Sequence, residues 1–313
     1  MRKGINPVKQ LQTVEKPQRV TATVLNHLPF LDGFYADMLK VLDLSLTSLR
    51  EHAGMDFDLL VFDNASCSEA RAYLLSEFEK GNIQTLILSD RNMGKGGAWN
   101  VMLQAAPGEI VAYADNDVLY HEGWLHESVR VLETYPNVGM VTSRPYHSIP
   151  ELYSANLEWA NANPEVQVES GHLINPKWIR EFLLSLGRTE GEILEDISQE
   201  DVKLTYKRVS TFCGASHWQF LAWKKVLLEF LPIDLSKPLG QVLRLDKMVN
   251  ERGYLRLMTD QPYVMNLSNS LELPDAAQKS PEPAKRKRIV DFPLIKSPLM
   301  RLYHAIFRLY YDR

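Results

Sequence analysis

Several features that would narrow the class of a protein at once are scarce or absent from this sequence. Its two cysteines, Cys67 and Cys213, lie far apart and lack the C-x-x-C spacing of a zinc or redox site, so we expect two reduced thiols. Its apolar stretches, such as residues 110–114, are far shorter than the roughly 20 residues that cross a bilayer as a helix. No internal repeat is present, which excludes solenoids and propellers.

Charge of neither sign dominates the chain. It has 35 Lys and Arg against 39 Asp and Glu, a formal net charge of −4 at pH 7. This balance gives no general electrostatic reason to bind nucleic acid, and we expect no nucleic-acid partner. Residues 1–18 carry basic side chains without a continuous apolar core, so we expect a loose N-terminal arm rather than a signal peptide. Taken together, these absences favour a cytoplasmic protein.

The first half alternates short apolar stretches with segments of helical periodicity. Stretches of this kind that are apolar along their whole length predict a parallel sheet covered by helices on both faces, which is an α/β fold. Within the second of the four expected helices, Ser66 and Glu69 have the spacing of a capping box. The expected strands lie at 20–25, 59–62, 84–88, 110–113 and 138–141.

Polar residues follow three of these strands directly, as Asn26-His27, Asp63-Asn64 and Asp115-Asn116-Asp117. One such ending means little, because Asn and Asp are common in turns. Ligands of open α/β sheets, however, bind beyond the carboxyl ends of the strands. Three polar endings together therefore predict a polar site at this edge.

Asp115 and Asp117 are two residues apart, and on an extended chain such residues project to the same side. Two carboxylates without a neighbouring His or Cys suit Mg²⁺ or Mn²⁺, ions that leave positions open for phosphate oxygens. The D-x-D pattern alone is a weak signal.

Residues 92–100 precede the D-x-D strand by one helix and contain three glycines and Lys95. Glycines permit close backbone approach to a ligand, and Lys95 supplies a charge for a diphosphate. The spacing is neither that of a Walker loop nor that of a dinucleotide-binding loop. The alternative is that these glycines only begin a helix packed closely on the sheet.

Together, Asp63 to Ser66, residues 92–100 and Tyr113 to Asp117 resemble the GT-A glycosyltransferases, in particular family 2, across about residues 20–145. The resemblance implies a GT-A, Rossmann-like, mostly parallel sheet flanked by helices, and a nucleotide-sugar donor. It implies that Asp63 holds the base or ribose and that Asp117 is the main metal ligand, with Asp115 near ribose and metal. The donor-binding residues that we expect are Asn26, Asp63, Asn92, Lys95, Asp115 and Asn116. The family's first strand usually ends in proline and threonine, so Asn26-His27 leaves the choice among UDP, GDP and dTDP open.

The second half matches the family less well. Residues 212–220 resemble the glycine-containing strand on the acceptor side, and Asp246, in the helical segment that follows, is our choice for the general base. Asp201 is the alternative, although it precedes the Gly214 strand and so comes in the wrong order. A surface carboxylate beside Arg244 and Lys247 is the competing interpretation of Asp246. The histidines of this half, namely His147, His172 and His217, receive no catalytic role.

The predicted activity is metal-dependent transfer of a sugar to a hydroxyl acceptor, either a glycan, a lipid-linked sugar or a small molecule. Inversion at the anomeric carbon is implied by the family. One rival is a sugar-nucleotide nucleotidyltransferase, which would need a glycine-rich basic loop after the first strand, where Asn26-His27-Leu28-Pro29 stands. The other rival is a GT-A-like binding or scaffold protein without turnover.

The resemblance also predicts how the rest of the chain is divided. We expect a nucleotide-sugar-binding half over 19–145, a helical acceptor-side region over 146–271, whose acidic run from Glu190 to Asp201 forms a solvated helical face, and a proline-rich linker over 272–290. An amphipathic helix over 291–313 would dock on the protein or form a homodimer, or else rest peripherally on the inner face of the membrane.

Overall fold

A computed structural model describes residues 4, 6, 8, 13–235 and 240–271. The linker and the C-terminal helix expected over 272–313 lie outside the described residues. Residues 13–18 are exposed and form no helix or strand. The strands of the main sheet are β1 (Val20–Asn26), β2 (Asp58–Asn64), β3 (Thr85–Ser89), β4 (Ile110–Asp115), β6 (Val138–Thr142), β7 (Gln167–Gly171), β8 (Asp201–Tyr206), β9 (Val209–Cys213), β10 (Gln219–Trp223) and β11 (Leu255–Thr259).

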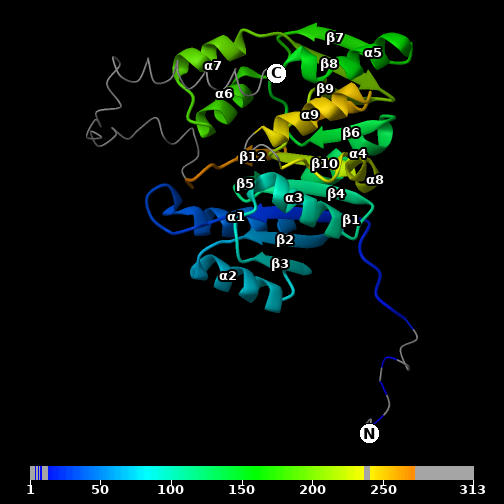
Figure 1. The fold of residues 1–313 in the computed structure, drawn as a ribbon. Coiled ribbons are helices and arrows are strands. Elements are labelled where there is room, and N and C mark those ends of the chain that lie inside the picture. Colours follow the sequence, from blue (N-terminus) through cyan, green and yellow to red (C-terminus); the bar gives the residue numbers. More distant parts are fainter. Residues whose placement is uncertain (1–3, 5, 7, 9–12, 236–239, 272–313) are drawn as a thin grey trace. The chain divides into compact units, whose positions relative to one another are not determined.

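In the described residues these strands form a ten-stranded sheet in the order β3-β2-β1-β4-β10-β6-β11-β9-β8-β7 (Figure 1). The strands β1 to β4 pair in parallel, and β10 runs antiparallel between β4 and β6. Because β10 comes from the predicted acceptor-side region, the two predicted halves share one sheet. The short strands β5 (Val118–Tyr120) and β12 (Val264–Asn266) pair separately.

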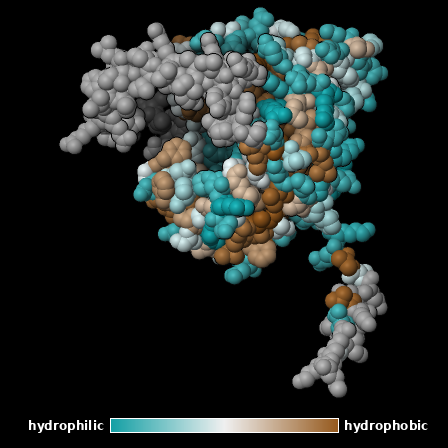
Figure 2. Space-filling model, in the orientation of Figure 1, coloured by the Kyte–Doolittle hydropathy of each residue, from teal (hydrophilic) through white to brown (hydrophobic). Residues whose placement is uncertain are grey.

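Helices cover both faces of the sheet, as the apolar strands predicted, and the α/β class is confirmed. The helices are α1 (Met38–Glu51), α2 (Ser68–Glu79), α3 (Gly94–Ala105), α4 (Trp124–Thr134), α5 (Ser154–Ala162), α6 (Pro176–Ser185), α7 (Glu190–Ile197), α8 (Lys224–Leu227) and α9 (Gln241–Glu251), with 3-10 turns η2 (Gly33–Tyr35), η3 (Pro150–Leu152) and η4 (Leu228–Phe230). Figure 2 shows hydrophilic residues over much of the visible face, with smaller hydrophobic areas between them. Among the described residues no helix is long and apolar enough to span a bilayer.

Alternate residues of each parallel strand point to opposite faces. In β4, Ala112 packs in the core beneath α1 and α4, whereas Val111 and Tyr113 pack in the core beneath α3, α8 and α9. The same alternation divides β2, where Val61 faces the first core and Phe62 the second. Whether a residue has an odd or an even position along a strand therefore decides which face of the sheet its side chain points to.

The acceptor-side region is less helical than we predicted. Three antiparallel strands, β7 to β9, extend the sheet beyond β11, and Asp201 begins β8 instead of continuing a helical face. The acidic run forms helix α7 only as far as Ile197. A capping box between Thr189 and Glu192 lies at the N-terminus of this helix. Tertiary pairing of β8 with two neighbours overrides the helical composition of its flank.

A buried histidine joins this antiparallel extension to α7. His147 has a side chain that is 3% exposed, with Nδ1 2.7 Å from Asp196 Oδ1 and Nε2 3.5 Å from Asp201 Oδ2. Burial would lower the pKa of His147, but the hydrogen bonds to Asp196 and Asp201 outweigh burial and raise the pKa from 6.5 to about 9. His147 is therefore charged at neutral pH and holds the two aspartates together.

Since the folded pKa lies above the unfolded one, the contribution of His147 to stability is complete below pH 6.5 and is lost as the pH rises through about 9. We expect the difference in unfolding free energy between the wild type and His147→Gln to shrink by up to about 3 kcal/mol between pH 6 and pH 10. Urea unfolding at a series of pH values measures this difference. A difference that stays constant across the series would contradict the assignment.

Candidate functional site

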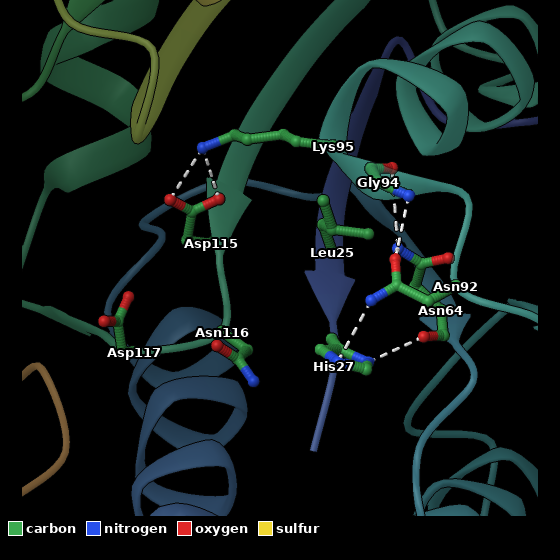
Figure 3. Close-up of a pocket in the computed structure, with 9 residues that line it drawn as sticks. All are labelled: Leu25, His27, Asn64, Asn92, Gly94, Lys95, Asp115, Asn116 and Asp117. Atoms are coloured by element: carbon green, nitrogen blue, oxygen red, sulfur yellow. Dashed lines mark hydrogen bonds and ion pairs between the residues drawn. The ribbon is translucent and has the colours of Figure 1, made fainter. Parts of the chain in front are cut away.

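A pocket of about 320 Å³ opens at the carboxyl ends of β1, β2 and β4, beside the start of α3 (Figure 3). This is the edge at which the three polar strand endings predicted a site. The pocket is lined by Leu25, His27, Asn64, Asn92, Gly94, Lys95, Asp115, Asn116 and Asp117. It thus brings together the predicted residues of the D-x-D segment and of the segment that begins α3.

We expected the D-x-D segment to be extended throughout, but it is not. Strand β4 ends at Asp115, and Asn116 and Asp117 form a turn that leads into β5. Both carboxylates nevertheless line the same pocket, Asp117 on the turn and Asp115 at the strand end (Figure 3).

Lys95 reaches across the end of β4 to Asp115 (Figure 3). Its Nζ lies 2.8 Å from both carboxylate oxygens of Asp115, and the Tyr113 hydroxyl donates to Asp115 Oδ1 at 2.5 Å. The ammonium group also lies over the rings of Trp99 and Tyr113, at 5.5 and 5.4 Å from their centroids. Lys95 is therefore held at the pocket wall by one carboxylate and two aromatic faces.

Asp117 forms no ion pair with any cationic side chain in the described part of the chain. Burial and the neighbouring charge of Asp115 raise the pKa of Asp117 from 3.8 to about 7, and Lys95 offsets them only in part. An additional positive charge in the pocket would therefore favour the ionised form of this carboxylate.

The donor set fits a divalent cation that shares its ligands with a substrate. No group of three or more His, Cys, Asp or Glu side chains in the described part of the chain could hold a metal ion. Mg²⁺, however, is commonly held by one or two carboxylates together with substrate phosphates and water. Asp117 and Asp115 supply that number, so the pair suits such an ion and does not form a closed, all-protein metal site.

Two predicted donor contacts, Asn26 and Asp63, lie under the pocket instead of lining it. Both are fully buried, and they face each other across β1 and β2 on the side of α1. The Asn26 amide donates to Asp63 Oδ1 at 2.9 Å and to Ser66 Oγ at 3.0 Å, and its oxygen accepts from Asn116 Nδ2 at 2.7 Å. We call Asn26, Asp63, Ser66 and Asn116 the Asn26 cluster.

The capping box that we expected between Ser66 and Glu69 does not form, because Ser66 belongs to the Asn26 cluster. Helix α2 begins after Cys67 and has no side-chain cap. Ser66 instead accepts a hydrogen bond from Leu28 N at 2.9 Å, and Arg71 Nε lies 3.3 Å from Asp63 Oδ2. The polar residues after β1 and β2 therefore fix the loops around the pocket.

Two pocket residues that sequence reasoning did not select are His27 and Asn64. His27 Nδ1 donates to the Asn64 carbonyl at 2.7 Å, which leaves Nε2 to accept from Asn92 Nδ2 at 3.1 Å. The Asn64 amide donates to Asn92 Oδ1 at 3.0 Å. His27 directly follows β1 and Asn64 ends β2, each beside a predicted residue, so this position was the available signal.

The glycines at the start of α3 support the close-packing interpretation at one position. A Cβ on Gly96 would lie 2.8 Å from Gln241 Oε1, so Gly96 lets the start of α9 approach α3. Gly94 has φ of +68°, a conformation that side chains other than glycine rarely adopt. Its backbone conformation places Lys95 at the edge of the pocket.

The candidate bases do not line the pocket. Asp246 is 3% exposed; its Oδ1 lies 2.6 Å from Arg256 Nη2 and its Oδ2 3.0 Å from His217 Nδ1. The interpretation of Asp246 as a surface carboxylate is therefore wrong, and a direct role as base stays a prediction. Asp201 lies five strands from β4, where its Oδ2 accepts from the backbone N–H groups of residues 173 and 174.

The sheet, its helices and the polar pocket at its carboxyl edge define a protein of the GT-A fold. Residues 34–182 match the family described as glycosyl transferase family 2. This range contains Asp63, Lys95, Asp115 and Asp117 and ends before Asp246. Residues 34–182 thus match the family that the sequence resemblance predicted.

Individual relatives are more distant. An uncharacterized glycosyltransferase of Nostoc sp. is 26% identical over 102 residues, which are 33% of this chain and 32% of that protein. GalNAc-T7, solved with UDP, GalNAc and Mn²⁺, aligns with a TM-score of 0.50 and 14% identity over 81% of this chain and 44% of its own. S. aureus TarS 1–349 aligns with a TM-score of 0.44 and 14% identity, covering 79% of this chain and 60% of that one. The likeness to GalNAc-T7 concerns the fold.

Replacing Asn26 by alanine removes both amide donors and the acceptor oxygen from a buried cluster. Asp63, Ser66 and Asn116 would then each lack a partner, so we expect the free energy of unfolding to fall by about 2–4 kcal/mol. The matched control Asn163→Ala removes an exposed contact to Glu165 N and is expected to change it by less than about 1 kcal/mol. Urea unfolding compares the two variants; equal effects would contradict a supporting role for Asn26.

Proposed function

We propose that this protein is a glycosyltransferase that moves a sugar from a nucleotide-sugar donor to a hydroxyl acceptor. The observation that carries the proposal is the placement of Lys95, Asp115 and Asp117 in one pocket at the carboxyl edge of the sheet, within a glycosyl transferase family 2 segment. The Mn²⁺ and UDP in the structure of GalNAc-T7, which has a similar fold, support a metal-assisted nucleotide-sugar donor.

The donor diphosphate is proposed to lie against Lys95. The Lys95 side chain at the pocket wall is 25% exposed, so water would screen its charge only weakly from a phosphate in the pocket. A Mg²⁺ or Mn²⁺ ion held by Asp117 and Asp115 would offset the negative charge that develops on the leaving diphosphate. His27, Asn64 and Asn92 form a second wall of hydrogen-bonding groups, suited to the polar parts of the donor.

The acceptor oxygen is proposed to attack the anomeric carbon from the face opposite the diphosphate, which inverts that centre. Its proton must leave during the attack, so a base is required on the acceptor side. The acceptor-side loop between β9 and β10 adjoins the donor pocket, since the Trp218 carbonyl accepts from Asp115 N at 2.9 Å. Acceptor binding along this loop is part of the proposal.

A panel of UDP-, GDP- and dTDP-sugars with and without Mn²⁺ tests donor binding by thermal unfolding. At about 100 times Kd, we expect a stabilisation of about 3 kcal/mol, or roughly 5–10 °C, with one nucleotide class. Asp117→Asn should abolish the Mn²⁺-dependent part, whereas Asp56→Asn, an exposed aspartate on another edge, should not. No shift with any nucleotide would overturn the donor site, and binding without any turnover would identify a scaffold protein.

Lys95→Met should change the affinities for the two ligands in opposite directions. Loss of a charged contact should weaken binding of the preferred nucleoside diphosphate by about 10- to 100-fold. Mn²⁺ alone should bind more tightly, because Asp115 no longer pairs with an ammonium group. Titration calorimetry measures both affinities, with Lys40→Met, on the exposed side of α1, as the control. Parallel weakening of both ligands would contradict the assignment of Lys95 to the diphosphate.

A further inference from the structure

His217 stands on the loop between β9 and β10 and is held on one side only. Its side chain is 35% exposed, and its Nδ1 lies 3.0 Å from Asp246 Oδ2. A carboxylate accepts hydrogen bonds, so Nδ1 carries the proton in the neutral ring. Among the described residues no side chain or backbone group bonds to Nε2, whose lone pair is therefore available.

The carboxylate that orients His217 is itself fixed inside the protein. Asp246 Oδ1 accepts from Arg256 Nη2 at 2.6 Å, and Arg256 is fully buried. The same guanidinium donates to the carbonyls of Leu152 and Ala215, at 2.7 and 2.6 Å. These bonds hold the Asp246 carboxylate in place, so its hydrogen bond fixes the orientation and the tautomer of the imidazole.

The fold places this pair beside the donor pocket. Strand β10 runs antiparallel to β4 with Gln219 opposite Ala114, and the Trp218 carbonyl bonds Asp115 N. His217 precedes Trp218 in the chain, so its backbone lies one residue from the carbonyl that bonds Asp115. On the same face, α9 begins against Gly96 of α3, one residue after Lys95.

We propose that His217, rather than Asp246, removes the proton from the acceptor hydroxyl, and that Asp246 and Arg256 are positioning residues. This rests on the proposed function. The acceptor oxygen bonds to the anomeric carbon as the bond from that carbon to the diphosphate oxygen breaks; the hydroxyl proton moves to His217 Nε2, and the nucleoside diphosphate leaves. Imidazole, with an ordinary pKa of about 6.5 against about 3.9 for an aspartate, is the stronger base of the two side-chain types.

The arrangement also explains why Asp246 can be buried at a site that needs a base. Both oxygens of this buried carboxylate already accept hydrogen bonds, from Arg256 and from His217, so it has little access to an acceptor hydroxyl. One bond away, the half-buried imidazole combines access to solvent with a fixed orientation. The carboxylate therefore acts through His217.

The first experiment needs no substrate. In ¹⁵N-labelled full-length protein, imidazole nitrogen–proton correlation spectra should show His217 as the Nδ1–H tautomer at neutral pH. Asp246→Asn should disturb this pattern, and His172→Gln, which replaces an exposed histidine bonded to Gln199 O, should leave it unchanged. An Nε2–H tautomer at His217 would overturn the proposal whatever the activity is.

The second experiment measures release of nucleoside diphosphate from the donor that stabilises the protein, with water as the acceptor. His217→Asn keeps an amide donor for Asp246 but has no basic nitrogen. We expect turnover to fall by about 100- to 10,000-fold with nucleotide affinity unchanged within about twofold, and added imidazole to restore part of the rate of His217→Ala. Asp246→Asn should lower turnover less, without rescue by imidazole.

The outcomes separate the two proposals. If wild-type protein binds and hydrolyses the donor but His217→Asn retains turnover within about threefold, the base assignment is wrong and the proposed function stands. If His217→Asn loses nucleotide affinity together with turnover, the residue supports the donor site and is not the base. If the wild type binds no nucleotide, the proposed function fails, and the tautomer measurement still decides whether Asp246 orients His217.

Discussion

The polar edge of this sheet depends on one buried amide. Asn26 uses both of its N–H groups and its oxygen to join the ends of β1, β2 and β4, through Asp63, Ser66 and Asn116. Parallel strands end with unpaired polar groups at the same level, and a fully satisfied network there fixes their relative positions. One part of the pocket lining stands at or just after these strand ends, whereas Asn92, Gly94 and Lys95 stand between β3 and the start of α3. The Asn26 cluster therefore supports the first part of the lining.

The pocket above that cluster has an unbalanced charge distribution. Two carboxylates share one ammonium group, which bonds Asp115 and leaves Asp117 with a raised pKa. The three groups carry a net charge of about −1 when both carboxylates are ionised, which would attract a divalent cation before a diphosphate; a bound cation would in turn attract the diphosphate. The Lys95 ammonium group would then have two anionic partners, the Asp115 carboxylate and a phosphate. A change of partner would need only a movement of the Lys95 side chain.

The loop between β9 and β10 depends on a different interaction, a buried ion pair. Arg256 and Asp246 are both buried, and their pairing leaves one carboxylate oxygen for His217, which lies nearer to solvent. Strand β10, which follows His217 in the chain, lies between β4 and β6. The parallel strands β1 to β4 and the mixed remainder of the sheet thus meet along β4 and β10, and the pocket lies at the carboxyl end of β4.

Sequence alone determined the strands of the first half, the class of the fold and the D-x-D segment with Lys95, because apolar strands and polar endings are local patterns. Tertiary structure decided which of the polar strand endings line the pocket. Asn26 and Asp63 share the parity that faces α1, whereas Asp115 faces α3, and no local pattern says on which side α3 lies. The strands β7 and β8, the burial of Asp246 and its link to His217 likewise depend on contacts between distant segments. Such contacts are set by packing, which short-range periodicity does not encode.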